Sequence, residues 1–113
     1  MKQFIGVLIG GVLLAASPVL AQDAKKISEG KKIYDSKECS KCHMIAGKGN
    51  KIGPLDGVSS KLSEADIRKW LTEPAEMEKT LDHKPKVKMS SKKIVLQPAE
   101  VDAVVAYLQS LKK

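Results

Sequence analysis

Large aromatic side chains are scarce in this chain, and the scarcity limits the core that it can build. Its 113 residues include only one Phe, one Trp and two Tyr. Phe4 lies in an N-terminal apolar run that we expect to be removed, which leaves Tyr34, Trp70 and Tyr107. A domain of about 90 residues buries roughly two-thirds of its unfolded surface and usually needs a disulfide, a metal or a cofactor. The composition therefore predicts that a large prosthetic group fills part of the core.

The N-terminal run has the pattern of a secretory signal peptide. Met1-Lys2 gives a positive start, an uncharged apolar stretch follows over residues 4–14, and Val19-Leu20-Ala21 offers small residues at a cleavage site. An uncleaved anchor is the alternative, because the run is almost long enough to span a bilayer. Its Gly, Ser and Pro residues favour cleavage. We therefore expect residues 1–21 to be a cleaved signal peptide and residues 22–113 to be one periplasmic domain without a stable membrane span.

Two helices are predicted in the first part of the mature chain. Residues 24–36 carry a stripe at helical spacing, formed by Ile27, Gly30 and Tyr34. Ser63 has the position of an N-cap, and Trp70 and Leu71 continue the apolar face of the helix that follows it. Pro74 ends this second helix or starts a short new turn, because the residue before a proline avoids helical geometry.

The strongest helical pattern lies at the C-terminal end. Pro98 suits the first turn of a helix, Glu100 suits its positive end and Lys112 its negative end. The apolar stripe between them is unbroken and consists of Val101, Val104, Val105, Leu108 and Leu111. No segment alternates like a strand with hairpin punctuation. The domain is therefore predicted to be all-α.

Five consecutive residues form the pattern C-x-x-C-H, namely Cys39-Ser40-Lys41-Cys42-His43. This pattern is the signature of covalent haem c attachment. Two thiols three positions apart on a helical turn can reach the two vinyl groups of one haem and form thioethers. The histidine that follows then lies under the iron as the proximal ligand. We therefore predict one haem c with its iron, attached through Cys39 and Cys42, with His43 as an axial ligand.

Three other kinds of site can use a pair of cysteines. A thioredoxin-like dithiol site needs a strand–turn–helix context, which the sequence lacks. A disulfide across two intervening residues would staple very little chain. A zinc site would have to use Cys39, Cys42, His43 and His83, but the adjacent Cys42 and His43 cannot easily converge on one small ion. Haem attachment is therefore the preferred interpretation.

Around this motif the chain resembles the class I (monohaem) c-type cytochrome family over essentially all of residues 24–112. Gly30 and Tyr34 match the glycine and the aromatic residue of the family's N-terminal helix, and Tyr107-Leu108 matches the pair with which the C-terminal helix crosses it. The WLTEP segment at residues 70–74 is similar to the family's aromatic-Leu-x-x-Pro helix. The resemblance implies a small cytochrome c fold, in which three to five helices wrap around one covalently bound haem.

The resemblance also assigns the surroundings of the proximal ligand. Gly53-Pro54 looks like the family's G-P, where the proline carbonyl accepts the proton of the proximal histidine. Such a bond fixes the ring and makes it a better donor to the metal. By the same resemblance Pro54 and Trp70 belong to the haem environment.

The family usually supplies the distal ligand as a methionine from a loop before the last helix, often in Lys-Met-Pro. Lys88-Met89 lies in that place, with Ser90 where proline is common. A thioether is a soft, neutral ligand that stabilises reduced iron. The resemblance therefore implies Met89 as the distal ligand, and His83 or an open, water-bound iron remain alternatives. Met77 is more typical of packing, and Met44 directly follows the proximal histidine and cannot reach the opposite face.

The charges of the mature chain are unevenly distributed. Loss of the signal peptide takes one lysine from a formal net charge of +7 and leaves +6. Residues 84–93 hold five lysines and no acid, whereas residues 64–82 have a net charge of −3. Other lysines surround the attachment motif: Lys37, Lys41, Lys48 and Lys51. The plain interpretation is a solvated surface, but a basic ring around a haem edge also steers it towards redox proteins with acidic docking surfaces. No nucleic-acid partner is expected.

Together these features predict an electron carrier and not an enzyme. With both axial positions filled, the iron would cycle between Fe(III) and Fe(II) without binding substrate. The protein would be a soluble, exported monomer that shuttles single electrons between larger redox proteins. The alternatives are a haem subunit of a periplasmic oxidoreductase, or a haem protein with an open distal site for gas binding or peroxidase-like chemistry. For the last of these, His83 and Arg68 are the few candidate acid–base groups.

Overall fold

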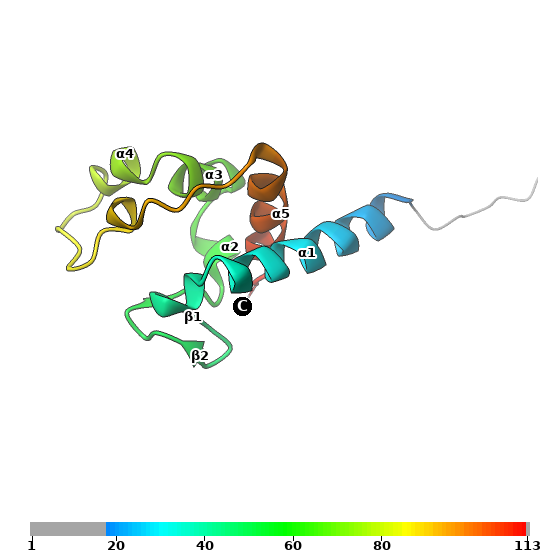
Figure 1. Cartoon of the computed structure of the whole chain (residues 1–113), viewed down its shortest axis with the longest axis horizontal. Coiled ribbons are helices and arrows are strands. Elements are labelled where there is room, and N and C mark those ends of the chain that lie inside the picture. The colour runs from blue at the N-terminus through cyan, green and yellow to red at the C-terminus, as the bar shows by residue number, and fades with distance from the viewer. Residues whose placement is uncertain (1–17, 113) are drawn as a thin grey trace, which may run out of the picture.

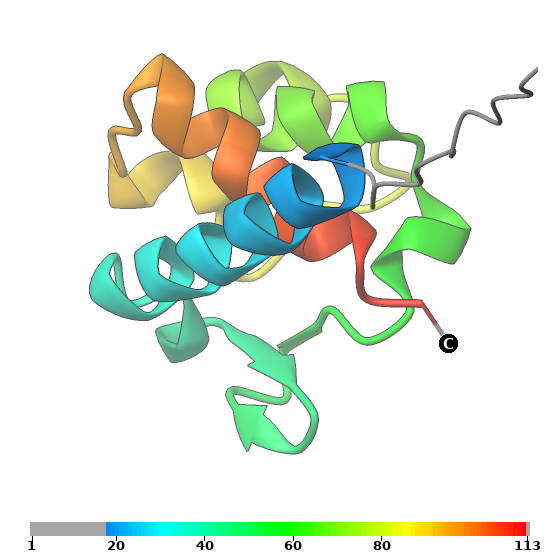
Figure 2. The ribbon, with the colours of Figure 1, turned by 90° about the vertical axis from the view of Figure 1, so that its right-hand side faces the viewer.

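Two helices from opposite ends of the chain make the main packing contact in this protein. A computed structural model describes residues 18–112, with side chains from residue 23 onward. Helix α1 (Pro18–Ser36) crosses helix α5 (Pro98–Gln109), as Figure 1 and the turned view of Figure 2 both show. Shorter elements connect these two helices, so the α1–α5 pair is the frame on which the rest of the chain packs.

The connecting elements are three short α-helices, two 3-10 helices and a small sheet. In chain order they are η1 (Cys39–Lys41), β1 (His43–Ile45), β2 (Lys48–Gly49), β3 (Gly53–Pro54), α2 (Val58–Lys61), α3 (Glu64–Thr72), α4 (Pro74–Glu78) and η2 (Met89–Lys92). The sheet has the order β2-β1-β3, with β1 antiparallel to β2 and parallel to β3.

The all-α fold class is therefore confirmed, and the small sheet is an addition to it that the sequence did not predict. Its strands contain three, two and two residues. Strands this short show no alternation of apolar and polar side chains that could be detected in a sequence.

Gly30 allows α1 and α5 to approach closely. A β-carbon at this position would overlap the backbone carbonyl of Ala103 and would lie 2.7 Å from the Cβ of Tyr107. One turn later in α1, Tyr34 packs edge-on against Tyr107, with ring centroids 5.7 Å apart and ring planes at 65°. Both rings are buried, and burial is the main cause that raises the pKa of Tyr34 to about 12. The crossing near the glycine that the resemblance implied is thus present, with Tyr107 as the aromatic partner.

The hydrophobic core lies against one face of α5. The predicted stripe on this helix is buried over its helical part, together with Val58 of α2 and Ile67 of α3; the buried members are Val101, Val104, Val105 and Leu108. The helix ends at Gln109, earlier than the lysines at the C-terminus had suggested, and Leu111 packs on the core from beyond the helix.

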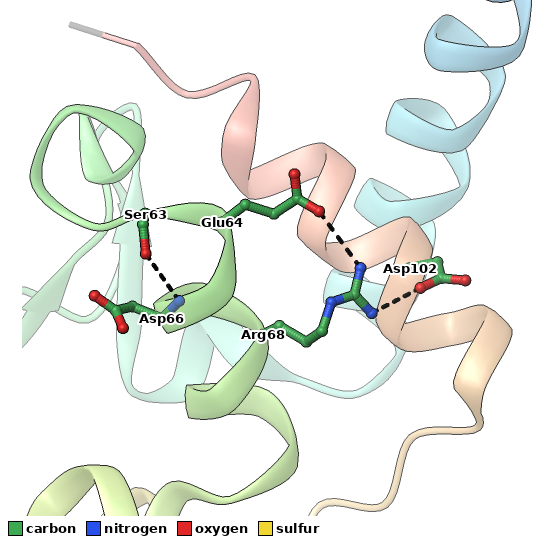
Figure 3. A network of polar contacts seen from close by, with 5 residues as sticks. All are labelled: Ser63, Glu64, Asp66, Arg68 and Asp102. Carbon is green, nitrogen blue, oxygen red and sulfur yellow. Dashed lines mark hydrogen bonds and ion pairs between the residues drawn. The ribbon is translucent and has the colours of Figure 1, made fainter.

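Helix α3 is joined to α5 by packing and by one ion-pair network (Figure 3). Ser63 caps the helix as predicted, because its hydroxyl accepts a hydrogen bond of 3.1 Å from the Asp66 N–H. Arg68 then bridges the two helices: its guanidinium lies 2.7 Å from Asp102 on α5 and 3.7 Å from Glu64 on its own helix. Ile67, between these polar groups in sequence, is only 2% exposed. The network adds a polar contact between α3 and α5 to their packing.

The structure changes the predicted start of the first helix and refines the predicted end of the second. Helix α1 extends back to Pro18, past the expected cleavage point after Ala21, while the rest of the predicted signal peptide lies outside the described residues. Both of the roles predicted for Pro74 are found: α3 ends shortly before it, at Thr72, and Pro74 is the first residue of the short helix α4. Within residues 18–112, no helix combines the length and the apolar character needed to cross a membrane.

The crossing at Gly30 generates a prediction about stability. Gly→Ala inside a helix normally stabilises by about 0.5–1 kcal/mol. Here the new methyl group meets the Ala103 carbonyl, and overpacking of a rigid backbone contact costs about 1–3 kcal/mol or more. The cost of the overlap therefore exceeds the gain from the higher helix propensity of alanine. Gly30→Ala should lower the free energy of unfolding by about 2 kcal/mol in denaturant titration. Glu29→Ala, on the exposed side of the same helix, serves as the control and should change it by less than about 0.5 kcal/mol. Equal stability of Gly30→Ala and the parent would contradict the crossing.

Candidate functional site

The two cysteines lie on one tight turn between α1 and the sheet. Glu38 adopts a left-handed conformation (φ 58°) that redirects the chain after α1, and η1 then begins at Cys39. The turn closes with a hydrogen bond of 3.1 Å from the Cys42 N–H to the Cys39 carbonyl. Both thiols are free and half-buried. Cys39 also packs against the core beside α1, so this turn has a fixed position relative to the helical frame.

The imidazole of His43 is oriented by a backbone carbonyl. Its Nδ1 lies 2.9 Å from the Gly53 oxygen. A carbonyl can only accept, so Nδ1 carries the proton and Nε2 is left as the nitrogen that can bind a metal. The resemblance implied the Pro54 carbonyl as the acceptor, and this detail is wrong for the structure. In the parallel pairing of β1 with β3, His43 is matched with Gly53, whereas Pro54 is matched with Met44.

Gly53 is also the residue whose lack of a side chain makes room for that ring. A β-carbon there would lie 2.6 Å from the His43 Nδ1 and 2.8 Å from the Cys42 carbonyl oxygen. Only glycine therefore permits β3 to lie so close to the imidazole. The glycine acts through both its missing side chain and its carbonyl, which together set the position of His43.

Asn50 ties this loop to the turn that holds the cysteines. Its side-chain amide donates to the Lys41 carbonyl at 2.9 Å, and its backbone N–H donates to the His43 carbonyl at 3.0 Å. Its side-chain oxygen accepts from the Ile52 N–H at 2.9 Å. Sequence reasoning missed Asn50. The available signal was weak: an Asn that hydrogen-bonds to the backbone two residues on is common in turns.

The environment of Cys39 does not suit a dithiol redox enzyme. Burial is the main cause that raises the pKa of the Cys39 thiol, whereas reactive cysteines of such enzymes have lowered pKa values. The cysteine pair also follows a helix and precedes a strand, which is the reverse of the thioredoxin-like order. In the described part of the chain, no three His, Cys, Asp or Glu side chains are grouped so that they could hold a metal ion.

The other predicted site residues come from separate elements. Trp70 is on α3, half-buried, yet it is absent from the hydrophobic residues that pack on the core. Pro54 is exposed at the end of β3. Met89 is half-buried and begins η2, which packs on α4. In Figure 1 the α3–α4–η2 segment lies above and the η1–β1 segment below, both to the left of the α1–α5 crossing. The elements that carry Trp70 and Met89 therefore lie above the cysteine turn in this view.

The other candidate ligands lie in three different places in the fold. His83 is exposed in the irregular loop between α4 and η2. Met77 is half-buried within the short helix α4. Met44 is in β1 beside His43, so its position on the proximal side agrees with the reason for setting it aside.

The residues present fit a covalently attached haem. Two reachable thiols lie on one turn, and the histidine directly after them has Nε2 free while its Nδ1 is held. Because Gly53 has no β-carbon, its backbone lies close against that ring and holds it in place. Trp70, a large apolar side chain outside the core, is available to cover a flat apolar group.

This geometry predicts the effect of adding one methyl group at Gly53. Gly53→Ala should displace the His43 ring and lower the free energy of unfolding of the haem-loaded protein by about 1–3 kcal/mol. The proton NMR signal of His43 Nδ1–H should shift or disappear at the same time. Gly47→Ala is the control, because Gly47 has φ +80° but nothing within 4 Å of a β-carbon. It should show only backbone strain, with the His43 signal unchanged. An unaltered His43 signal in Gly53→Ala would contradict the role of the glycine.

Comparison with known proteins agrees with this chemistry. The family model described as Cytochrome c matches residues 27–112, from within α1 to beyond the end of α5. No curated protein and no solved structure matched the chain. The matched family binds haem c with its iron covalently and generally carries electrons, and Cys39 and Cys42 fit its attachment motif. The chain belongs to the cytochrome c family.

Proposed function

We propose that this protein is an exported, periplasmic monomer that carries single electrons from one redox protein to another. The observation that supports this most is the fixed histidine. His43 follows two thiols on one turn and presents Nε2, because Gly53 holds Nδ1. Export is proposed from the signal-peptide pattern of residues 1–21.

Each site residue has one role in this proposal. Cys39 and Cys42 would form the two thioethers, and His43, whose ring is oriented by its bond to the Gly53 carbonyl, would be the proximal iron ligand. Met89 is the distal ligand, and its neutral sulfur favours the reduced state. Trp70 and Pro54 would lie next to the bound haem. Haem c, when bound, supplies the Fe(III)/Fe(II) couple.

An open distal site with acid–base chemistry has less support. Arg68 is engaged by Asp102 at 2.7 Å and by Glu64 at 3.7 Å, at the contact between α3 and α5. His83 is exposed. A peroxidase-like reaction needs a positioned acid or base within hydrogen-bond reach of the reacting group. Neither candidate side chain has a position that favours this role.

The test is the absorption spectrum of the mature, haem-loaded protein in its oxidised and reduced states. Sharp reduced bands of low-spin haem c and a weak near-infrared sulfur-to-iron band in the oxidised state are expected. Met89→Ala should abolish the near-infrared band, and Met77→Ala should leave it unchanged. If the parent lacks this band and its spectrum shifts with carbon monoxide, the distal site is open or replaceable, and catalysis or gas binding would replace the carrier proposal.

A basic surface next to η2 supports the proposed docking on acidic partners. All five lysines of residues 84–93 are exposed. None of them forms an ion pair among the residues that the structure describes, although lysines elsewhere do: Lys31 pairs with Asp35, Lys41 with Glu38 and Lys79 with Glu76. Unpaired, exposed cations beside the distal ligand are free to meet the carboxylates of a partner and to speed encounter.

Removing part of this surface should slow electron transfer. The triple variant with Lys86, Lys88 and Lys93 changed to Gln should react with an acidic redox partner about tenfold more slowly at low salt. The difference should shrink as salt screens the charges. The control changes Lys25, Lys26 and Lys32 of α1 to Gln, with the same loss of charge and little expected effect. Equal rates for the two triple variants would contradict steering by this surface, provided that the sulfur-to-iron band is intact in both.

A further inference from the structure

The last residue of α4 makes two hydrogen bonds to the residue that follows Met89. The Ser90 N–H donates to Oε2 of Glu78 at 2.9 Å, and the Ser90 hydroxyl donates to Oε1 at 2.8 Å. Both oxygens of one carboxylate are therefore used by one residue. The two partners are twelve positions apart in the chain, so these bonds close the whole irregular segment between α4 and η2.

The carboxylate is well suited to hold this segment. The hydrogen bond from the Ser90 backbone N–H is the largest of the causes that lower the pKa of the Glu78 carboxyl, with smaller effects from the Ser90 hydroxyl, Lys88 and the Met89 backbone. The group is thus charged near neutral pH. Hydrogen bonds to an ionised acceptor are shorter and stronger than those between neutral groups.

We propose that Glu78 is the positioning residue for the distal ligand: it binds Ser90 and thereby fixes the first turn of η2, which begins at Met89. This inference rests on the proposed function, in which Met89 binds the iron. Glu78 itself is not proposed to touch the metal or the haem.

The local sequence explains why such a bond is needed. Serine stands at position 90, where a proline would restrict the backbone by its ring. A proline at position 90 would have no backbone N–H to donate. The hydrogen bond from this N–H to Glu78 therefore requires a residue other than proline there. The N-cap residue of η2, Lys88, makes no side-chain capping bond. The residues just before it are largely exposed, Val87 at 41% among them. The bond to Glu78 is therefore the main polar anchor described at the start of η2.

The consequence of losing the anchor concerns the stability of the iron–sulfur bond. A loosened η2 would release Met89 from the iron more often. His83 in the same loop and Lys88 next to Met89 would then compete for the free position. Carbon monoxide can be used to measure this release, because it binds ferrous haem only when the distal ligand has left.

The experiment compares four variants of the haem-loaded protein with the parent. Glu78→Ala removes both acceptors, and Ser90→Ala removes only the hydroxyl bond. Glu78→Gln is the conservative variant, since its amide oxygen can accept from the Ser90 N–H and its amide nitrogen can donate to the Ser90 hydroxyl. Glu76→Ala is the matched control: Glu76 is on the same helix and pairs with Lys79 at 3.1 Å, without a bond to η2.

We expect Glu78→Ala to speed carbon monoxide binding to the reduced protein about tenfold, because it removes hydrogen bonds to a charged acceptor. The oxidised sulfur-to-iron band should weaken in parallel. Ser90→Ala should have a smaller effect in the same direction, and Glu78→Gln should stay close to the parent. Glu76→Ala should match the parent, and circular dichroism should show equal helix content in all variants. A merely structural role for Glu78 would lower overall stability without changing the band in the folded protein.

The outcomes separate this inference from the proposed function. If the parent has the sulfur-to-iron band, and Glu78→Ala and Ser90→Ala both leave the band and the carbon monoxide rate unchanged, the positioning role is wrong while Met89 ligation stands. If the parent has no such band, the assignment of Met89 itself is wrong, and the inference fails with it. Should Glu78→Ala not fold, Ser90→Ala decides the matter alone, because it removes one half-buried hydroxyl bond and leaves the backbone bond in place.

Discussion

The close crossing of α1 and α5 at Gly30 is the contact on which the rest of this structure depends. It joins the two ends of the domain, and it brings Tyr34 and Tyr107 together as the aromatic centre of a small core. The buried residues of α2 and α3 pack against the same helix α5. Residues on the side of the domain that carries the site also pack on this core, Cys39 and Ile45 among them. Hydrogen bonds then fix the loops on that side.

Two such sets of hydrogen bonds hold the two sides of the site. On the cysteine side, Asn50 and Gly53 bind the backbone of the turn and the ring of His43. On the other side, the Glu78 carboxylate binds Ser90 directly after Met89. In both cases, hydrogen bonds to a neighbour in sequence or across a loop fix the position of the residue that would bind iron. Metal ligands in proteins are usually oriented in this way.

The longer helices were predicted well from the sequence because they are local patterns, and the C-x-x-C-H pattern fits the attachment motif of the matched family. The stripe of α5 and the N-cap at Ser63 follow from spacing within one element. The choice between Gly53 and Pro54 as the acceptor for His43 could not be made in this way, since it depends on the register of two short strands. The bond between Glu78 and Ser90 was not foreseen either, because it crosses a loop that has no pattern of its own. Local periodicity predicts elements, whereas contacts between loops require the folded chain.

The central proposal is that His43, directly after the cysteine turn, and Met89, at the start of η2, would both bind the haem iron. The most direct test is the proton NMR spectrum of the reduced, haem-loaded protein. A methionine bound to low-spin haem iron lies over the macrocycle, where the ring current shifts its methyl signal far upfield. We predict one such signal, assigned to Met89 by selective methionine labelling. A Met89 methyl signal at its ordinary position would contradict the account and would show that another group, or none, binds the iron opposite His43.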